Sequence, residues 1–301
     1  MSSWGPSRDF VGYGEQTPDP RWPGGARVAV NFVLNYEEGS EPSVQDGDGY
    51  TENRLTDSGV SVAGRDLAAE GMFEYGSRVG FWRIHREFVA RAVPLTVFGC
   101  SVALERNPSA AAAIRSAGHD VCSHGLRWVN HTDLDEEEER RQIAAAAASL
   151  TDTVGAAPEG WYCRYGPSTN TRRLLVEHGG FTYDSDSYAD ELPHWVDVDG
   201  TDHLVVPYSL TTNDARLLSS LPTADLWSRF ICDSFDVLYA EGATAPKMLS
   251  IGLHNRIIGH PGRFAGLLRV LDHICGHEDV WITHRSEIAH HWRTTHPPEA
   301  S

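Results

Sequence analysis

Several features that define other classes of protein are missing from this sequence of 301 residues. No segment offers the roughly 18 or more consecutive apolar residues that a membrane-spanning helix needs. Residues 1–20 also lack the basic start and apolar stretch of a secretory signal peptide. The sequence therefore predicts a cytoplasmic protein that does not bind membranes.

Positive charge and paired cysteines are also scarce. Lysine and arginine number 25 against 42 aspartates and glutamates, which gives a formal net charge of −17 and makes nucleic acid a poor candidate partner. The five cysteines are scattered without a CxxC pair, so we expect buried thiols of a reducing compartment rather than a structural zinc site. The sequence leaves open whether the chain forms a homo-oligomer.

Short runs of β-branched and aromatic residues alternate with amphipathic helical patterns. The predicted strands are residues 27–35, 95–99, 120–124, 160–164, 181–186, 204–208, 248–254 and 280–284, and predicted helices include 80–93, 109–117, 171–178 and 263–274. This alternation is typical of parallel strands joined by crossover helices, so the sequence predicts an α/β fold. Residues 1–25, rich in Pro and Gly, are predicted to form an N-terminal arm, and residues 26–295 a single domain.

Two local patterns predict how parts of the domain are built. Asp133 and Glu136 have the spacing of a capping box, acidic residues fill the turn that follows, and Gly155 marks the far end of the same helix. By contrast, residues 37–79 are polar and rich in glycine, which predicts loops over one end of the barrel.

Polar residues gather where the predicted strands end. They are Asn35 to Glu38, Ser123, His124, Arg164, Tyr165, Asp184, His254 and His284. In a parallel barrel the carboxyl ends of the strands meet at one face, where the active sites of such barrels lie. A single His or Asp at a strand end is more often a helix cap, but several that converge indicate an enzyme.

Five segments resemble the motifs of a known family, in the family's order. They are NFVLNYEEG at residues 31–39, SHGLRW at 123–128, RYGP at 164–167, YDSD at 183–186 and LSIGLH at 249–254. The chain is similar in these motifs to the NodB-homology polysaccharide deacetylases. The resemblance covers roughly residues 25 to 295 and implies the NodB-homology fold, a deformed (β/α) barrel of about seven parallel strands.

The metal site of that family is altered here. Its metal-dependent members use aspartates in the first motif and a His-x-x-x-His pair, whereas this chain has Glu37, Glu38 and, four residues after His124, Trp128. An indole N–H only donates, so Trp128 cannot bind a cation. Glu38 and His124 remain as weak candidates for a loosely held divalent metal, while catalytic zinc normally has three protein ligands. His131 could substitute, but we expect it beyond the strand end, and no cofactor is expected.

Other segments resemble the metal-independent allantoinases of purine catabolism, which are similar to polysaccharide deacetylases. They are RDFVGYG at residues 8–14, FEYGSRVGFWR at 73–83, YDSDSYADELPHW at 183–195 and EGATAPKMLSIGLH at 241–254. This resemblance implies a small cyclic amide or ureide as substrate, such as a hydantoin. It also adds Glu74 and Arg78 as candidate pocket residues, although their four-residue spacing alone is typical of an ordinary helix-surface pair. The segment at 161–173 is one residue longer than the expected pattern, which bears on the substrate.

Hydrolysis of an amide needs a base for water and an acid for the leaving nitrogen. Glu37 or Glu38 is the expected base, because adjacent carboxylates can raise one pKa, and only one of the two is expected to face the cavity. His254 is the expected acid because imidazole titrates near neutral pH. Asp184, from the aspartate motif, is counted with these catalytic residues.

The remaining site residues are expected to contact the substrate. His124 would be an oxyanion donor or a substrate contact, and Trp128 either a flat wall for a planar ring or ordinary barrel packing. Arg164 could neutralise a carboxylate, grip a substrate oxygen, or form a buried ion pair with Asp184.

Two other functions compete with a cyclic-amide hydrolase. A polysaccharide or peptidoglycan N-deacetylase would need an exported chain, an open groove and normally a metal. A noncatalytic binding protein on the same barrel would be favoured if Glu37, His124 and His254 did not converge.

Overall fold

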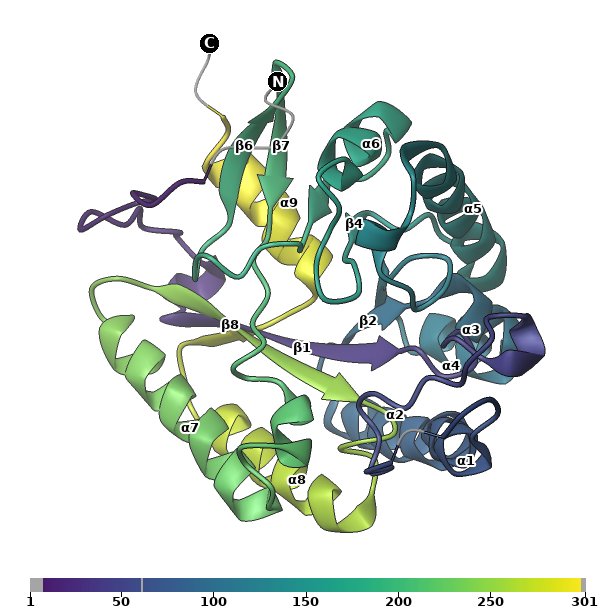
Figure 1. The fold of residues 1–301 in the computed structure, drawn as a ribbon. Coiled ribbons are helices and arrows are strands. Elements are labelled where there is room, and N and C mark those ends of the chain that lie inside the picture. The colour runs from purple at the N-terminus through teal and green to yellow at the C-terminus, as the bar shows by residue number, and fades with distance from the viewer. Residues whose placement is uncertain (1–7, 61, 299–301) are drawn as a thin grey trace.

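The computed structural model describes residues 8–60 and 62–298, in which a curled, mostly parallel sheet forms an incomplete barrel with helices on its outside (Figure 1). The strands are β1 (Val28–Tyr36), β2 (Thr96–Gly99), β3 (Asp120–Ser123), β4 (Gly160–Trp161), β5 (Tyr183–Asp184), β6 (His194–Val198), β7 (Thr201–Val205), β8 (Lys247–His254) and β9 (Val280–Ile282). The helices are α1 (Leu67–Tyr75), α2 (Phe81–Arg91), α3 (Ser101–Arg106), α4 (Pro108–Ser116), α5 (Glu136–Val154), α6 (Thr171–His178), α7 (Ala224–Glu241), α8 (Pro261–Cys275) and α9 (Arg285–Thr295).

The sheet order confirms the predicted α/β barrel fold. Strands follow the order β6-β7-β5-β4-β3-β2-β1-β8, with β9 paired to β1, and every pairing is parallel except that of β6 with β7. The β6–β7 hairpin was not predicted. Its turn, Asp199-Gly200, has positive φ at both residues, and Asp-Gly between two strand patterns was the signal available in the sequence.

Strand β1 lies at the centre of the fold and fixes the position of the site. All of its residues are buried between β2 and β8, as expected of a parallel strand covered on both faces. Asn35 near its end is in register with His254 at the end of β8. The residues that follow β1, beginning with Glu37, therefore emerge beside His254.

The N-cap of helix α5 lies two residues later than predicted. Asp135, not Asp133, is the N-cap, and its Oδ1 accepts a hydrogen bond from the Glu138 N–H at 2.8 Å. Asp133 instead belongs to the short 3-10 helix His131–Asp133. Gly155 ends the helix in the left-handed region with φ of 87°, as predicted.

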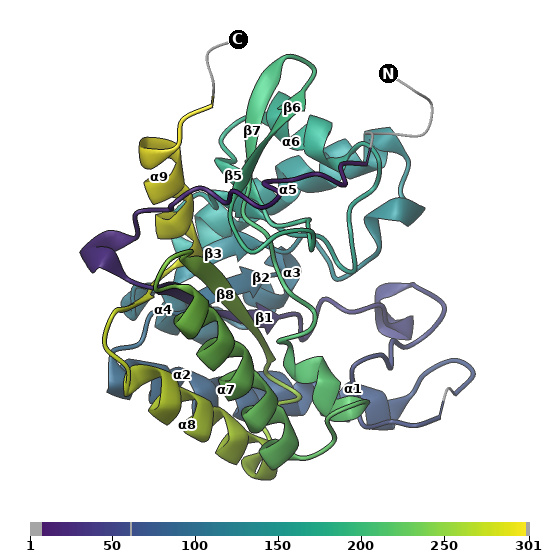
Figure 2. The same cartoon turned by 90° about the vertical axis from the view of Figure 1, so that its left-hand side faces the viewer.

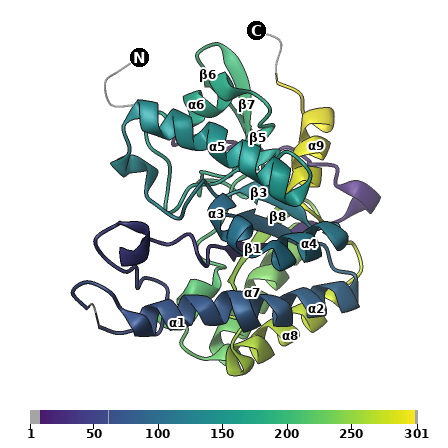
Figure 3. The same ribbon diagram turned by 90° about the vertical axis from the view of Figure 1, so that its right-hand side faces the viewer.

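Residues 37–79 are not loops throughout. Asp66 caps α1, and α1 continues through a π-helical segment, Gly76–Gly80, into α2 (Figure 3). The glycines of this stretch indicated a loop, but Gly76 serves close packing instead. A Cβ at this position would lie 2.6 Å from Oε1 of Glu38, so the bare backbone lets the helix pack against that carboxylate.

The N-terminal arm packs against the chain at several points, and it runs beside the β6–β7 hairpin in Figure 2. The Tyr13 hydroxyl donates to the carbonyl of Pro193 at 2.6 Å, and the buried Trp22 donates through Nε1 to the carbonyl of Lys247 at 3.0 Å. The contact of Trp22 joins the arm to Lys247, the first residue of β8.

Residues 8–60 and 62–298 contain no helix that is both long and apolar enough to cross a membrane. Cys100, Cys122 and Cys163 are buried free thiols, as predicted, but Cys275 is exposed and Cys232 half-buried, because both lie on helices outside the barrel.

Candidate active site

Five of the predicted site residues line one small cavity at the carboxyl end of the strands: Glu37, His124, Trp128, Arg164 and His254. The cavity has a volume of about 60 Å³, and its other lining residues are Asn35, Leu55, Tyr162, Tyr165, Tyr208, Leu210, Asn213 and Ala215. Ligand pockets are typically several hundred Å³, so the group that reaches Glu37 must be compact. Glu38, Asp184, Glu74 and Arg78 do not line this cavity.

The carboxylate of Glu37 is held between two imidazoles and a guanidinium. Its Oε1 lies 3.3 Å from Nε2 of His124 and 3.6 Å from Nε2 of His254, and Oε2 accepts from Arg256 at 2.6 Å. Burial alone would raise the pKa of Glu37, but Arg256 and His254 hold this pKa well below its usual range. The expectation that the neighbouring carboxylate raises this pKa is therefore wrong, because Glu37 is ionised by its cationic partners.

His254 is held from behind by Asp214, a residue that the sequence did not indicate. Oδ1 of Asp214 lies 2.7 Å from Nδ1 of His254, and Oδ2 accepts from the backbone N–H of the same histidine at 2.7 Å. Burial lowers the pKa of His254, but Asp214 and Glu37 outweigh burial and raise the pKa to about 9. The imidazole is therefore protonated at neutral pH, with Nε2–H facing Glu37.

Glu38 points away from the cavity. Its Oε2 accepts from Nδ2 of Asn255 at 2.8 Å, and its Oε1 accepts from Arg256 at 3.1 Å. Arg256 therefore bridges both glutamates from a fully buried position. Two adjacent buried acids require a cation, and Arg256 lies only two residues beyond His254, so this partner could have been sought in the sequence.

His124 presents its second ring nitrogen to Glu37 because its first is already used. Nδ1 lies 2.9 Å from the carbonyl oxygen of Tyr162, and the two rings stack with centroids 5.1 Å apart. A carbonyl only accepts, so Nδ1 carries a proton. The ring is fixed in orientation with Nε2 toward the cavity.

Arg164 and Trp128 form one wall of the cavity. The guanidinium carbon lies 3.7 Å from the centroid of the indole, and NH1 donates to the carbonyl of Trp128 at 2.8 Å. The ion-pair partner of Arg164 is the buried Glu52. Of the roles left open for Arg164, an ion pair with Asp184 is therefore wrong, because Glu52 in the loop after β1 is paired with the guanidinium.

Asp184 is bound outside the cavity. It accepts from Arg172 of α6 at 2.6 and 3.0 Å, and its Oδ2 lies 3.1 Å from Nε2 of His203 on β7. Burial raises the pKa of Asp184, but Arg172 and His203 more than offset this and lower the pKa. The structure places this predicted catalytic residue in an ion pair that joins α6 to the sheet.

Glu74 and Arg78 form a surface pair. Their charged atoms are 3.3 Å apart, and the side chains are 64% and 76% exposed. They lie on α1 and the π-helical segment and face away from the cavity, since the buried side of α1 presents Phe73. Of the two interpretations left open for them, the helix-surface pair is confirmed and the place in the pocket is wrong.

Two other histidines that were candidates from the sequence, His131 and His284, also lie away from the cavity. His131 is buried with Nδ1 3.0 Å from Oε1 of Glu139 on α5. His284 follows β9, which is paired only with the first part of β1, and it caps α9 near Asp120 at the start of β3. Neither imidazole reaches Glu37.

The residues at the cavity do not fit a three-ligand metal site. Trp128 has no lone pair to offer, Glu38 is bound by Arg256 and Asn255, and the carboxylate of Glu37 is paired with the same guanidinium. Within the described part of the chain, one group of three possible ligands has its atoms within 4.8 Å of each other. It consists of Asp236, His273 and His277 and lies on α7 and at the end of α8.

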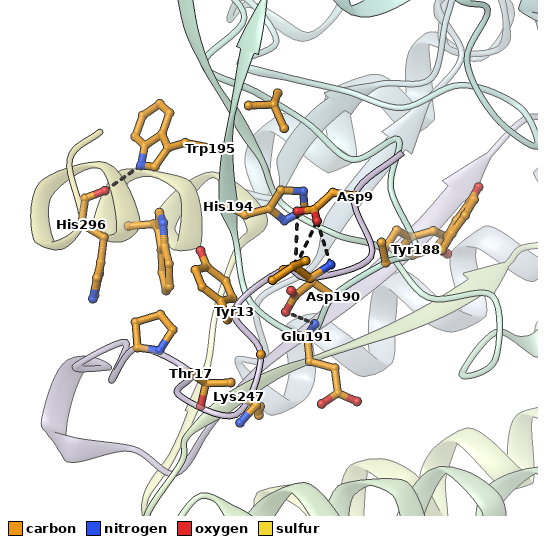
Figure 4. A pocket seen from close by; sticks show the side chains of 18 of the residues that line it. Asp9, Tyr13, Thr17, Tyr188, Asp190, Glu191, His194, Trp195, Lys247 and His296 are labelled. Carbon is orange, nitrogen blue, oxygen red and sulfur yellow. Dashed lines mark hydrogen bonds between the residues drawn. The ribbon is translucent and has the colours of Figure 1, made fainter. Parts of the chain in front are cut away.

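A larger cavity of about 1480 Å³ is lined partly by the N-terminal arm and shares the lining residues Tyr208 and Leu210 with the small cavity. Figure 4 shows its lining, which includes Tyr13, Tyr188 and His194. Several polar groups there are already paired, such as Trp195 Nε1, which donates to the carbonyl of His296 at 2.7 Å. The small cavity, in contrast, brings the carboxylate of Glu37 together with the imidazoles of His124 and His254.

Comparisons with known proteins identify the family. The family profile described as polysaccharide deacetylase matches residues 69–183. A Schizosaccharomyces pombe protein assigned by name to the polysaccharide deacetylases is 37% identical, over 98% of this chain and 99% of the relative. The chain belongs to the polysaccharide deacetylase family.

Two solved structures are similar along the whole chain. One, from Pseudomonas aeruginosa PAO1, is described as a probable polysaccharide deacetylase, with 46% identity, a TM-score of 0.93, and coverage of 97% of this chain and 99% of that one. The other is described as Puue allantoinase, with 47% identity, a TM-score of 0.93, and coverage of 97% and 98%. The protein is therefore a hydrolase of the deacetylase family that acts on a non-peptide C–N bond.

Proposed function

We propose that the protein opens a small cyclic amide such as a hydantoin, by general acid–base catalysis without a tightly bound metal. One observation carries this proposal: an ionised Glu37 lies 3.6 Å from the protonated Nε2 of His254 inside a cavity of only about 60 Å³. A base and an acid that both line a compact cavity suit a small amide. The similarity to Puue allantoinase supports the same substrate class.

The proposed reaction uses each of these groups once. Glu37 takes a proton from a water molecule, and the water oxygen bonds to the amide carbon to give a tetrahedral oxyanion. His254 then gives its Nε2 proton to the leaving nitrogen as the C–N bond breaks. Asp214 stabilises the imidazolium before transfer and fixes its orientation.

Arg256 supplies the fixed positive charge of the site in this proposal. It neutralises Glu37 and Glu38 together. Burial lowers the pKa of Arg256, but the two carboxylates raise it by more, so the net shift is upward. The guanidinium therefore stays charged at any pH at which the protein is folded. This fixed cation supports a metal-independent mechanism.

An activity screen with and without chelator tests the substrate and the metal together. The purified protein should hydrolyse hydantoin or a related cyclic ureide, leave N-acetylglucosamine oligomers intact, and keep its activity after dialysis against a chelator. Elemental analysis should find far less than one zinc per chain. Deacetylation of a chito-oligosaccharide with inert cyclic substrates, or activity abolished by chelator, would reject the proposal.

The pH dependence of kcat/KM should report the pKa of His254, the proposed acid. Because His254 must be protonated and its pKa is about 9, kcat/KM should be level through neutral pH and fall above about pH 9. The matched variant is Asp214→Asn, which removes an anion that stabilises the imidazolium and so moves the alkaline fall to lower pH. A wild-type profile that rises through pH 9, or the same midpoint in Asp214→Asn, would contradict the assignment.

The larger cavity favours N-deacetylation of an amino sugar as a second candidate. It adjoins the small cavity at Tyr208 and Leu210, so a substrate could place an acetamido group beside Glu37 and its remainder in the larger space. The same activity screen separates the two functions.

A further inference from the structure

Three uncharged side chains, those of Asn35, Tyr208 and Asn213, form a hydrogen-bonded group at the small cavity. Asn35 lies near the end of β1, Tyr208 follows β7, and Asn213 precedes the 3-10 helix Asp214–Leu218. All three line the same cavity as Glu37 and His254. Asn35 and Glu37 are two residues apart, so their side chains leave the chain on the same side.

Backbone contacts fix the orientation of both amides. Nδ2 of Asn35 donates to the carbonyl of Leu253 at 3.0 Å and to the Tyr208 hydroxyl at 3.4 Å. Oδ1 of Asn213 accepts from the Ala215 N–H at 2.8 Å, which leaves its Nδ2 to donate to the Tyr208 hydroxyl at 3.1 Å. The hydroxyl oxygen of Tyr208 therefore accepts two hydrogen bonds.

The two amides leave the proton of the Tyr208 hydroxyl available to donate. A phenol oxygen has two lone pairs and one proton, and the two amides occupy both lone pairs. Within residues 8–60 and 62–298, those two amides are the hydrogen-bond partners of this hydroxyl, and neither accepts its proton. A polar hydrogen at a buried site needs an acceptor, and the cavity is where one can enter.

The position of the hydroxyl is held by packing. The Tyr208 ring lies against Phe98 and Tyr162, with centroids 5.3 and 5.0 Å away. Gly252 on β8 makes room, since a Cβ there would lie 2.1 Å from the hydroxyl oxygen and 2.4 Å from Nδ2 of Asn213. Burial also raises the pKa of Tyr208, which keeps the hydroxyl protonated.

We propose that Asn35, Tyr208 and Asn213 form a subsite for a carbonyl oxygen, in which the Tyr208 hydroxyl donates to the oxygen of the scissile amide. This inference rests on the proposed function, because it assigns the oxyanion contact of the same reaction. With both lone pairs occupied, the hydroxyl can only donate, so the subsite selects a carbonyl and rejects a ring N–H. Its hydrogen bond strengthens as negative charge develops on the oxygen.

The test is Tyr208→Phe, which keeps the ring and removes the hydroxyl. On the substrate that the wild-type protein hydrolyses best in the screen, kcat should fall by roughly a hundredfold or more, with KM changed by less than about threefold. Circular dichroism and the thermal midpoint check folding. The matched control is Tyr183→Phe, because Tyr183 is a buried phenol in the same aromatic core whose hydroxyl does not reach the cavity. This control should keep wild-type kcat.

The possible outcomes separate the subsite from the proposed function. If the wild type deacetylates an amino sugar and Tyr208→Phe loses that activity, the substrate proposal fails and the subsite stands. Turnover within about threefold of wild type in Tyr208→Phe rejects the subsite, as does an equal loss in Tyr183→Phe. If no substrate is turned over, calorimetry with hydantoin decides: binding weakened several-fold by Tyr208→Phe supports the subsite, and unchanged or absent binding rejects it.

Discussion

Replacing Glu37 with glutamine should abolish most turnover and leave the fold intact. The glutamine keeps the size of the side chain and can still accept from Arg256, but it cannot take a proton from water. General-base catalysis is typically worth about a hundredfold to ten-thousandfold, so we expect kcat to fall by at least about a hundredfold. Calorimetric binding of the substrate should change little, because the lost interaction acts mainly in the transition state.

Glu74→Gln is the matched control for this experiment. It makes the same chemical change on an exposed side chain that does not line the cavity, and it should keep wild-type kcat. If Glu37→Gln retains more than about a tenth of wild-type turnover, then Glu37 is not the base.

Removing the buried guanidinium should destabilise the protein strongly. Arg256→Met keeps much of the side-chain volume but leaves Glu37 and Glu38 buried without their common cation. Breaking a buried ion pair from one side typically costs about 3–5 kcal/mol, which is a large part of the stability of an ordinary domain. Urea unfolding should show this loss in the free energy of unfolding.

Arg78→Met provides the control for that loss. It breaks an ion pair of the same residue types, but at the surface, where such pairs contribute about 0–1 kcal/mol. Equal destabilisation by the two substitutions would show that the network around Arg256 contributes no more than a surface pair.

The fold could be predicted from the sequence because its strongest signals are local. The apolar run of β1, the capping residues of α5 and the alternation of strands with helices each follow from neighbouring residues. The wrong predictions concern residues whose secondary structure depends on tertiary packing and not on their neighbours in the sequence. The glycines before α2 indicated a loop, yet Gly76 lies in the π-helical segment, where glycine is needed because a side chain would collide with Glu38.

The site residues that were predicted correctly are those that belong to recognisable sequence motifs. Glu37, His124 and His254 end or follow strands, so the topology brings them together. Asp214, Arg256 and Tyr208 were missed, because each acts through a partner that is distant in sequence or not part of a motif. Asp184 was misplaced for the same reason: Arg172, twelve residues earlier in the chain, pairs with it and holds it outside the cavity.

The cationic side chains around Trp128 also limit how the protein could change over evolution or in the laboratory. Two guanidinium carbons lie 3.7 and 5.0 Å from this indole, those of Arg164 and Arg256. A histidine introduced at position 128 would therefore face positive charge before any ion arrived, and Arg256 would still occupy both carboxylates. Building a three-ligand metal centre at this cavity would take substitutions at both Trp128 and Arg256, and removing Arg256 first would leave Glu37 and Glu38 buried without their cation. In the proposed metal-independent mechanism, this unstable variant would stand between the present site and a metal-dependent one.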